Sequence, residues 1–276
     1  GKSAAQLIAD DKCSAALDES GEATNLQTVN YSDTTWALLF NAAEGSVFQN
    51  QQLRQALAGI ARENADVPSG GLYAAAKGLV PEGLTVDGLD YRDAAGDPLP
   101  TISEPKALYL AARQGMATSD FSGVTLLLPK SAGLTELADQ VNSAWQKECS
   151  LFFSVEEVEQ DEFDARIAAG KYTIALAPIR AEGGSVYQML QQFTAEGGGL
   201  TGWSDPIYSQ RLAESAQQTG KDRCALLAQC ERQLLESCTV VPLMAQQKRL
   251  LLANGVRDLV FDPFFPVLDL TWAKIS

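Results

Sequence analysis

The chain has 276 residues, of which 46% are hydrophobic and 20% charged, and its 21 basic and 35 acidic side chains give a net charge of −14. This length suffices for one large or two modest domains with a real core. Because phosphates and anionic lipids bind to clusters of Lys and Arg, the acidic balance excludes a nucleic-acid partner and a basic membrane-binding surface, and it favours plain solubility.

No histidine occurs in the chain, and its five cysteines form no CxxC pair. His-based catalytic triads, zinc ribbons and most other zinc sites are therefore excluded, and we expect no metal and no cofactor. Helical spacing would place Cys224 and Cys230 about 9 Å apart along the axis, which is too far for a disulfide. The odd number leaves at least one thiol free, unless it pairs between chains, among Cys13, Cys149, Cys224, Cys230 and Cys238.

The first third of the chain is predicted to contain two helices and two strands, followed by a long irregular segment. Asn50 is placed to cap a helix at 50–64, because its side chain accepts a hydrogen bond from the first turn. Residues 65–103 are rich in Gly, Pro and Asp, and such a segment inside a compact domain is usually functional or covers a surface. A linker is the alternative, but the scattered Leu, Val and Tyr residues favour a segment that packs. The other predicted features are a helix at 3–10, a strand within 13–20, a strand at 35–41, and a buried stripe on helix 50–64 made of Leu53, Ala56, Leu57 and Ile60.

Helices and strands alternate from residue 104 onward. The order is a helix at 104–114 with Pro105 in its first turn, a strand at 123–129, a helix at 134–148, a strand at 150–158, a helix at 160–170 and a strand at 171–179. This β-α-β-α-β order predicts parallel strands with right-handed crossovers, and ligands of such sheets lie at the carboxyl ends of the strands. The remaining elements are helices at 205–217 and 221–236, strands at 239–245 and 249–254, a turn at Asn254 and Gly255, and a closing segment at 256–275.

Several stretches resemble, in their order and spacing, the C-terminal half of the peptide/nickel-type solute-binding proteins of ABC transporters, the dipeptide- and oligopeptide-binding kind. They are "WALLFN" followed by "VFQNQQLRQALAGIARE", then "LVPEGL", "SEPKALYLAARQGM", "DEFDARIAAGKYTIALAPIRAEGG", "GWSDPIYSQRLAESA", "CERQLLESCTVVPLM" and "NGVRDLVFDPFFPVLDLTWAKI". The chain departs from the family pattern at Asn50 and Gln52, which stand where the family has an acidic residue and an arginine, and in "PIRAEGGSVYQ", which replaces a Trp followed by "D-Y-P-D-P". These departures imply a diverged binding pocket.

The resemblance implies an α/β fold, namely a periplasmic-binding-protein-like lobe of type II with a mixed, mostly parallel sheet flanked by helices. Residues 35–250 are then the second ligand-binding lobe, residues 1–34 a remnant of the first lobe, and residues 251–276 the C-terminal return toward the first lobe. Because the family's members are longer, we expect a fragment that exposes half a cleft and binds ligand weakly. Its apolar tail would be partly uncovered, or would pair with itself or with a second copy.

The function that the resemblance implies is binding rather than catalysis. The expected protein is an extracytoplasmic solute-binding component of an ABC importer, which closes around di- or oligopeptides by a hinge motion and delivers them to a membrane permease. The chain begins within a predicted helix and contains no signal peptide, lipobox or membrane-spanning run. Membrane association is therefore expected only through a lipid anchor outside this sequence, as in a lipoprotein at the cell surface or in the periplasm.

In peptide-binding members of the family, an acidic residue after the cleft strand holds the ammonium group of the peptide. The resemblance places Glu182 at that position, and Ile179 in the same cleft segment. Arg180 would bind a carboxylate in bidentate fashion, and Gly183, with Gly184, would let backbone amides approach the ligand. The plainer alternatives are an exposed Glu182–Arg180 ion pair and a simple glycine turn.

Trp36 and Asn41, on the strand that enters the second lobe, are further ligand-contacting candidates. A core position is the alternative for Trp36, since large aromatic side chains are mostly buried. Arg54 is expected to be structural and to orient the loop after Asn41.

Three other functions stay open from the residues alone. A binder of a metal chelate or a sugar is one, although no histidine is present for a metal. A receptor lobe without a transport role is another. A carboxylate-based hydrolase would use "DEFD" or "VEEVEQDE", but these carboxylates have the spacing of solvated faces, and no GxSxG motif accompanies them.

Overall fold

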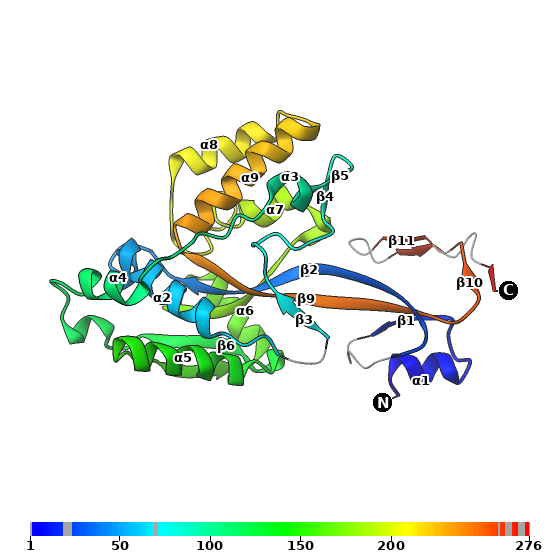
Figure 1. Cartoon of the computed structure of the whole chain (residues 1–276), viewed down its shortest axis with the longest axis horizontal. Coiled ribbons are helices and arrows are strands. Elements are labelled where there is room, and N and C mark those ends of the chain that lie inside the picture. Colours follow the sequence, from blue (N-terminus) through cyan, green and yellow to red (C-terminus); the bar gives the residue numbers. More distant parts are fainter. Residues whose placement is uncertain are drawn as a thin grey trace.

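The computed structural model of the chain describes residues 2–18, 24–68, 71–258, 260–262, 267–269 and 274–275 (Figure 1). Its α-helices are α1 (Ala4–Ala9), α2 (Gln51–Asn64), α3 (Tyr91–Ala95), α4 (Pro105–Ala112), α5 (Thr135–Cys149), α6 (Gln160–Ala168), α7 (Val186–Gln191), α8 (Pro206–Ser215) and α9 (Gly220–Glu236). Its strands are β1 (Ala15–Asp18), β2 (Gln27–Phe40), β3 (Tyr73–Ala75), β4 (Thr85–Val86), β5 (Leu89–Asp90), β6 (Thr125–Pro129), β7 (Ser154–Val158), β8 (Ile174–Arg180), β9 (Val240–Leu252), β10 (Val256–Arg257), β11 (Val260–Asp262), β12 (Val267–Asp269) and β13 (Lys274–Ile275). Short 3₁₀ turns are η1 (Val47–Gln49), η2 (Thr118–Phe121), η3 (Lys130–Ala132) and η4 (Glu182–Gly184).

One large sheet with the strand order β1-β9-β2-β8-β6-β7 organises the molecule, and β3 pairs with β9 beside it. β6 lies between β7 and β8 and is parallel to both, as the β-α-β-α-β order predicts. The described pairings of β1, β2, β3 and β9 are antiparallel. The α/β class is confirmed, whereas the expectation of a mostly parallel sheet holds only for β6, β7 and β8. A sequence indicates where strands form, but not which strands become neighbours.

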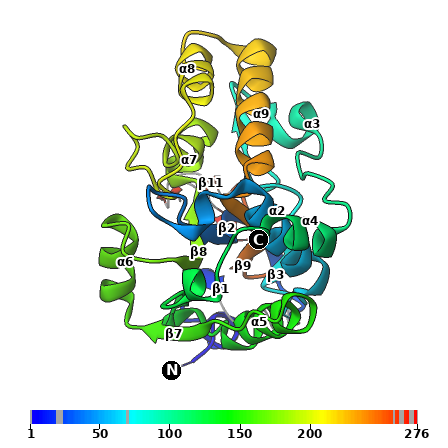
Figure 2. The same cartoon turned by 90° about the vertical axis from the view of Figure 1, so that its left-hand side faces the viewer.

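Helices cover both faces of this sheet (Figure 2). α2, α4 and α5 pack on one face, and α7, α8 and α9 pack on the other. Successive residues of β2 point to opposite faces, so Leu38 and Phe40 enter the first core, while Ala37 and Leu39 enter the second. All four side chains are at most 1% exposed. Burial on both faces explains why β2 has a continuous apolar run at its end instead of an alternating pattern.

α2 and α5 form as the sequence predicts, and they pack against each other. Asn50 caps α2, because its Oδ1 accepts a hydrogen bond from the backbone N–H of Leu53 at 3.1 Å. Trp145 of α5 is fully buried, and its Nε1–H donates to the carbonyl of Leu57 at 2.9 Å. The polar edge of the indole is therefore satisfied inside the core. The predicted stripe of α2 is buried throughout, at Leu53, Ala56, Leu57 and Ile60.

β2 and β9 differ most from the sequence prediction. β2 begins at Gln27, well before residue 35, and β9 is one strand where the sequence predicts two, at 239–245 and 249–254. Residues 246–248 are polar and half-buried, which interrupts the apolar pattern, but the pairing with β2 continues past them. Figure 1 shows the two strands leaving the helical body together toward α1 and β1.

The Gly- and Pro-rich segment 65–103 packs against the body, as predicted. It contains β3, the β4–β5 pair and α3. Its apolar side chains Leu79, Val80 and Tyr91 are at most 1% exposed. The backbone N–H of Gln247 in β9 donates to the carbonyl of Leu72 at 2.6 Å, which ties the start of this segment to the strand that leaves the body.

The end of the chain forms two short antiparallel pairs, β10 with β13 and β11 with β12. The β11–β12 pair confirms, for these two pieces, that the apolar tail pairs with itself. The rest of the tail prediction falls outside the described residues. Among the residues that the structure describes, no helix has the length and apolar character needed to cross a membrane.

Candidate functional site

The carboxyl ends of β6, β7 and β8 lie at one edge of the sheet, because these strands are parallel. β8 ends at Arg180, which pairs with Thr34, whereas Ile174 at its start pairs with Phe40. The edge with Arg180 is therefore the one at which β2 enters the helical body. The turn η4 follows β8 at this edge.

Glu182 is exposed in the turn η4. Gly183 and Gly184 have φ angles of +57° and +69°, a left-handed conformation that glycine adopts without steric cost. They belong to the same turn as Glu182, just after the carboxyl end of β8. The backbone N–H of Gly184 donates to the carbonyl of Ala181 at 3.0 Å, so the turn itself uses this group. The N–H of Gly184 is therefore used within the turn, and the carboxylate of Glu182 is exposed.

Arg180 is also exposed, two residues before Glu182. Its carbonyl accepts a hydrogen bond from Nε2 of Gln192 at 3.0 Å, which fixes the backbone at the end of β8. Within the part of the chain that the structure describes, neither Glu182 nor Arg180 is in an ion pair. The alternative of a Glu182–Arg180 pair is thus not observed.

Ile179 and Trp36 are core residues in this structure. Ile179 is 2% exposed, and its side chain packs in the second core. Trp36 is 6% exposed in the first core, and its Nε1–H donates to Oε1 of Gln246 at 3.3 Å. Trp36 therefore occupies a core position, which was the alternative to a ligand contact.

Asn41 directly follows β2, seven residues after Thr34, and at ~3.3 Å per residue the two are about 23 Å apart. Its Nδ2 donates to the carbonyls of Gly170 at 2.9 Å and Tyr172 at 2.8 Å, and its Oδ1 accepts from the N–H of Ala43 at 3.0 Å. The structure therefore does not bring Asn41 together with Glu182. Its side chain holds two loops at the far end of the sheet.

Arg54 of α2 is buried, and it orients the loop after β2 as expected. Its Nη1 donates to the carbonyls of Phe48 at 2.6 Å and Gln49 at 3.1 Å, and its Nε donates to the carbonyl of Ser237 at 2.9 Å. Burial lowers the pKa of this guanidinium from its usual value. These three carbonyl acceptors stabilise the charge, and no carboxylate among the described residues forms an ion pair with it.

Asp33 is a polar residue near Glu182 that the sequence analysis missed. It lies where the register of β2 against β9 shifts, between Tyr31 and Thr34. Its Oδ2 accepts from Nζ of Lys248 at 2.7 Å, and its carbonyl accepts from the N–H of Ala181 at 2.8 Å. Asp33 therefore connects a β-bulge, β9 and the residue before Glu182. The signal was the polar run "YSD" directly before an apolar strand.

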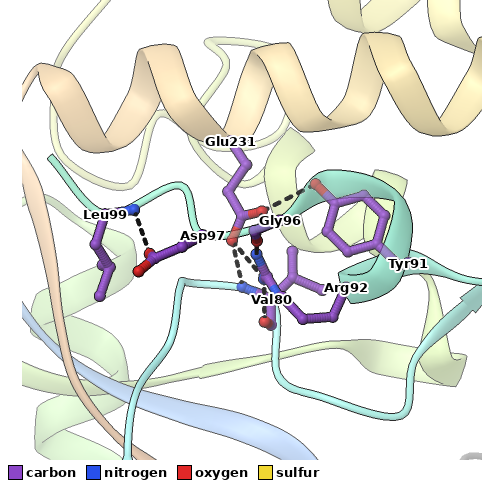
Figure 3. A network of polar contacts seen from close by, with 7 residues as sticks. All are labelled: Val80, Tyr91, Arg92, Gly96, Asp97, Leu99 and Glu231. Atoms are coloured by element: carbon purple, nitrogen blue, oxygen red, sulfur yellow. Dashed lines mark hydrogen bonds and ion pairs between the residues drawn. The ribbon is translucent and has the colours of Figure 1, made fainter.

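A second missed feature is the buried carboxylate of Glu231 in α9, which holds the segment before α3 (Figure 3). Its oxygens accept hydrogen bonds from Nη2 of Arg92 at 2.9 Å, the hydroxyl of Tyr91 at 2.9 Å and the N–H of Val80 at 2.9 Å. Arg92 also donates to the carbonyl of Val80. Burial, with the neighbouring Glu231, raises the pKa of Tyr91 well above its usual value, so the phenol stays neutral and donates.

The five cysteines are all free in this structure. Burial raises the pKa of Cys149 and Cys238 to about 11 and that of Cys230 to about 12. These thiols are therefore protonated at neutral pH and poor nucleophiles. Over the described residues, no group of three or more His, Cys, Asp or Glu is placed to hold a metal ion.

No protein-family model matches the sequence, and no curated protein matches it. Solved structures do match. The substrate-binding domain of an oligopeptide ABC transporter from Bacillus anthracis str. Ames has a TM-score of 0.75 at 17% identity over 99% of this chain, and OppA of Listeria monocytogenes bound to peptide has 0.71 at 18% over 99%. The chain has the substrate-binding-protein fold.

A substrate-binding protein from Microbacterium hydrocarbonoxydans, complexed with 4-hydroxybenzoate hydrazide, shares this fold with a TM-score of 0.64 at 17% identity over 99% of this chain. The chain spans 56% of the length of each of these three proteins. The resemblance predicted from the ordered motifs is thus confirmed at the level of the fold.

Proposed function

We propose that this chain is part of an extracytoplasmic solute-binding protein of an ABC importer, which binds peptides and is not an enzyme. The observation that supports this most directly is the exposed carboxylate of Glu182, which has no ion-pair partner among the described residues. It lies at the carboxyl edge of β8, where β2 enters the body. In open α/β sheets, ligands bind outside the carboxyl ends of the strands.

The division into lobes is part of this proposal. Residues 35–250 form the second lobe, and residues 1–34 and 251–276 belong with a first lobe. The paired strands β2 and β9 connect the two, as their course out of the helical body in Figure 1 supports. The bulge beside Asp33 is a natural place for a hinge, since bulges bend a strand without breaking its pairing.

Glu182 is proposed to bind the ammonium group of the peptide. While the cleft is open, water screens this carboxylate, and the interaction is weak. Closure of a first lobe over Glu182 would remove that water and strengthen the charge-assisted hydrogen bond. Binding would in this way shift the population toward the closed form. Arg180, at the same end of β8, would bind a carboxylate group of the ligand.

Delivery to a permease, a position at the cell surface or in the periplasm, and an N-terminal lipid anchor complete the proposed role. The structural neighbours that are ABC-transporter components support the first of these. An isolated second lobe would bind weakly, because it supplies only the contacts on one side of the ligand.

The test uses the full-length protein that contains this chain, stripped of bound solute by unfolding and refolding. Thermal unfolding is recorded with di- to hexapeptides and with the same peptides acetylated at the N-terminus. A peptide at 100 times its Kd should stabilise the protein by about 2.7 kcal/mol. Acetylation and the Glu182→Gln substitution should each remove most of this effect. Glu44→Gln, at an exposed carboxylate after the far end of β2, is the matched control.

If no peptide stabilises the protein, the peptide assignment is wrong. If acetylated peptides bind as well as free ones, the role of Glu182 is wrong.

A non-peptide solute is the second candidate. The Microbacterium protein with this fold binds an aromatic hydrazide, and the segment after β8 in this chain, "PIRAEGGSVYQ", departs from the peptide-binding pattern. Mass spectrometry of solute released from the protein as purified would identify such a ligand directly. Recovery of peptides alone would contradict this second candidate.

A further inference from the structure

A cavity of about 340 Å³ lies beside β9, on the far side of the β2–β9 pair from β8 and Glu182. β8 pairs with β2, and β3 pairs with β9, so these strands run in the order β8-β2-β9-β3. At ~4.8 Å between neighbours, β8 and β3 are about 14 Å apart. The cavity, which we call the β3 pocket, is lined by residues 30–32 of β2, by Ala245 and Gln247 of β9, and by residues between 74 and 83.

The wall formed by residues 74–83 is fixed by the buried pair of Glu231 and Arg92 (Figure 3). Both backbone groups of Val80, which lines the pocket, are bonded to this pair. A Cβ at Gly78 would lie 2.7 Å from Nη2 of Arg92 and 2.7 Å from Oε1 of Glu231, so only glycine fits there. The pocket is therefore preformed, as ligand pockets usually are.

Part of the floor of the β3 pocket is the face of the sheet that β9 and β3 share. Thr35 pairs with Ala245, and Ala245 pairs with Ala74, so these three side chains share one face of the sheet. Thr35 is fully buried, and among the described residues its Oγ1 has no hydrogen-bond partner. Thr35 itself does not line the pocket, whereas Ala245 and Ala74 do, so small side chains form this part of the floor and leave room for a ligand.

Among the described residues that line the pocket, Lys77 carries a positive charge and Glu82 a negative charge. Nζ of Lys77 lies 2.6 Å from Oε1 of Glu82, and both side chains are largely exposed, at 66% and 61%. An exposed pair of this kind is weak, so each group is free to exchange its partner for a charge on a ligand. A molecule with both an ammonium and a carboxylate group matches the two. The volume is at the small end of the range for ligand pockets, ~300–1,000 Å³, which suits a ligand of amino-acid size.

We propose that the β3 pocket binds a small zwitterion of the α-amino acid class, with its carboxylate on Lys77 and its ammonium group on Glu82. Residues 30–32 precede the bulge of β2, whereas residues 74–83 belong to the helical body. A ligand that contacts both sides of the bulge favours one hinge angle over others. This effect on the hinge rests on the proposed function; the binding itself does not.

The test is calorimetric titration of the 276-residue chain with each common α-amino acid, using concentrations into the millimolar range. Ala74→Leu places a larger side chain in the pocket from an exposed position and should weaken binding at least tenfold. Ala111→Leu, at an exposed alanine of α4, is the matched control and should leave affinity unchanged. Glu82→Gln, at an exposed side chain, should weaken binding without affecting folding.

The absence of binding by any amino acid overturns the proposal, and so does binding that neither Ala74→Leu nor Glu82→Gln weakens. Loss of binding in Glu182→Gln alone would place the amino acid at the peptide site, which overturns the β3 pocket but supports the proposed function. Conversely, amino-acid binding at the β3 pocket in a protein that binds no peptide would leave this inference standing and remove the proposed function.

Discussion

Glu231 shows how a single buried charge organises a long irregular segment. Its carboxylate is fully buried in α9 and is satisfied by Arg92, Tyr91 and the backbone of Val80. A buried ion pair contributes little net stability compared with apolar residues of the same shape, but the loss of one partner leaves a charge uncompensated. The role of this pair is therefore to specify where the segment between β3 and α3 lies.

Arg92→Met should destabilise the protein by about 3–5 kcal/mol, because it leaves the carboxylate of Glu231 buried without its cation. The double variant Arg92→Met/Glu231→Leu should recover a large part of this loss. Urea unfolding followed by circular dichroism measures both free energies. A double variant as unstable as the single one would contradict this account of the pair.

Thiol reactivity should separate Cys13 from the other four cysteines. Cys13 is half-buried, whereas Cys149, Cys224, Cys230 and Cys238 are buried, and burial raises the pKa of each of these four thiols. At pH 8, a thiol reagent should label Cys13 quickly and the others only after unfolding. Mass spectrometry of the labelled chain counts the modified sites, and Cys13→Ser should abolish the fast phase.

The same shifts predict a pH dependence of stability. The pKa of Cys149 and Cys238 is raised to about 11 in the folded state, so the unfolded chain releases these protons first as pH rises. Their contribution is fully present below the unfolded pKa of ~8.5 and is lost on the way to pH 11. Urea midpoints should fall over this range, and Cys149→Ala should reduce the slope. A slope unchanged in that variant would contradict the prediction.

At the scale of elements, α2 illustrates how local chemistry and packing agree. Asn50 caps its first turn, and its apolar stripe fills the first core beside Trp145. The cap determines where the helix begins, and the stripe determines which face is buried. Both features can be predicted from the sequence, because they depend on residues within a few positions of each other.

Asn50→Ala should cost about 1 kcal/mol of stability, since the N–H of Leu53 loses its acceptor. Asn50→Asp keeps an acceptor and should lose far less. The two variants are compared by urea unfolding at constant pH. Equal losses in both would indicate that Asn50 acts through another contact.

At the scale of the whole molecule, the β2–β9 pair extends out of the helical body and exposes apolar side chains. Leu17 and Val29 both pair with Leu250, so the three share one face of the sheet. Leu250 is buried, whereas Leu17 is 52% exposed and Val29 39% exposed. In the proposed two-lobed protein, the first lobe would cover this face.

The isolated chain should therefore self-associate as its concentration rises, through this apolar face. Sedimentation velocity over a range of concentrations measures the association. Leu17→Lys with Val29→Lys should shift the chain to monomer. Leu110→Lys, at a side chain of α4 that is 60% exposed, is the control and should have little effect. A monomer at all concentrations would contradict the prediction.

Elements whose signals are local could be predicted from the amino-acid sequence alone. Helix α2 with its cap, helix α5 and the parallel order of β6, β7 and β8 follow from spacing over a few residues and from right-handed crossovers. The order of motifs also predicted the fold, although no single motif is specific.

The remaining features became clear only from the fold, because they depend on contacts between residues that are far apart in the sequence. β2 pairs antiparallel with β9, and β9 continues as one strand through its polar stretch. Neither feature can be predicted without knowing which strands are neighbours. Local patterns likewise cannot predict that Asn41 lies far from Glu182, that Ile179 is buried or that Glu231 contacts Arg92. A side chain's environment is set by which elements pack beside it, and packing joins residues far apart in the chain.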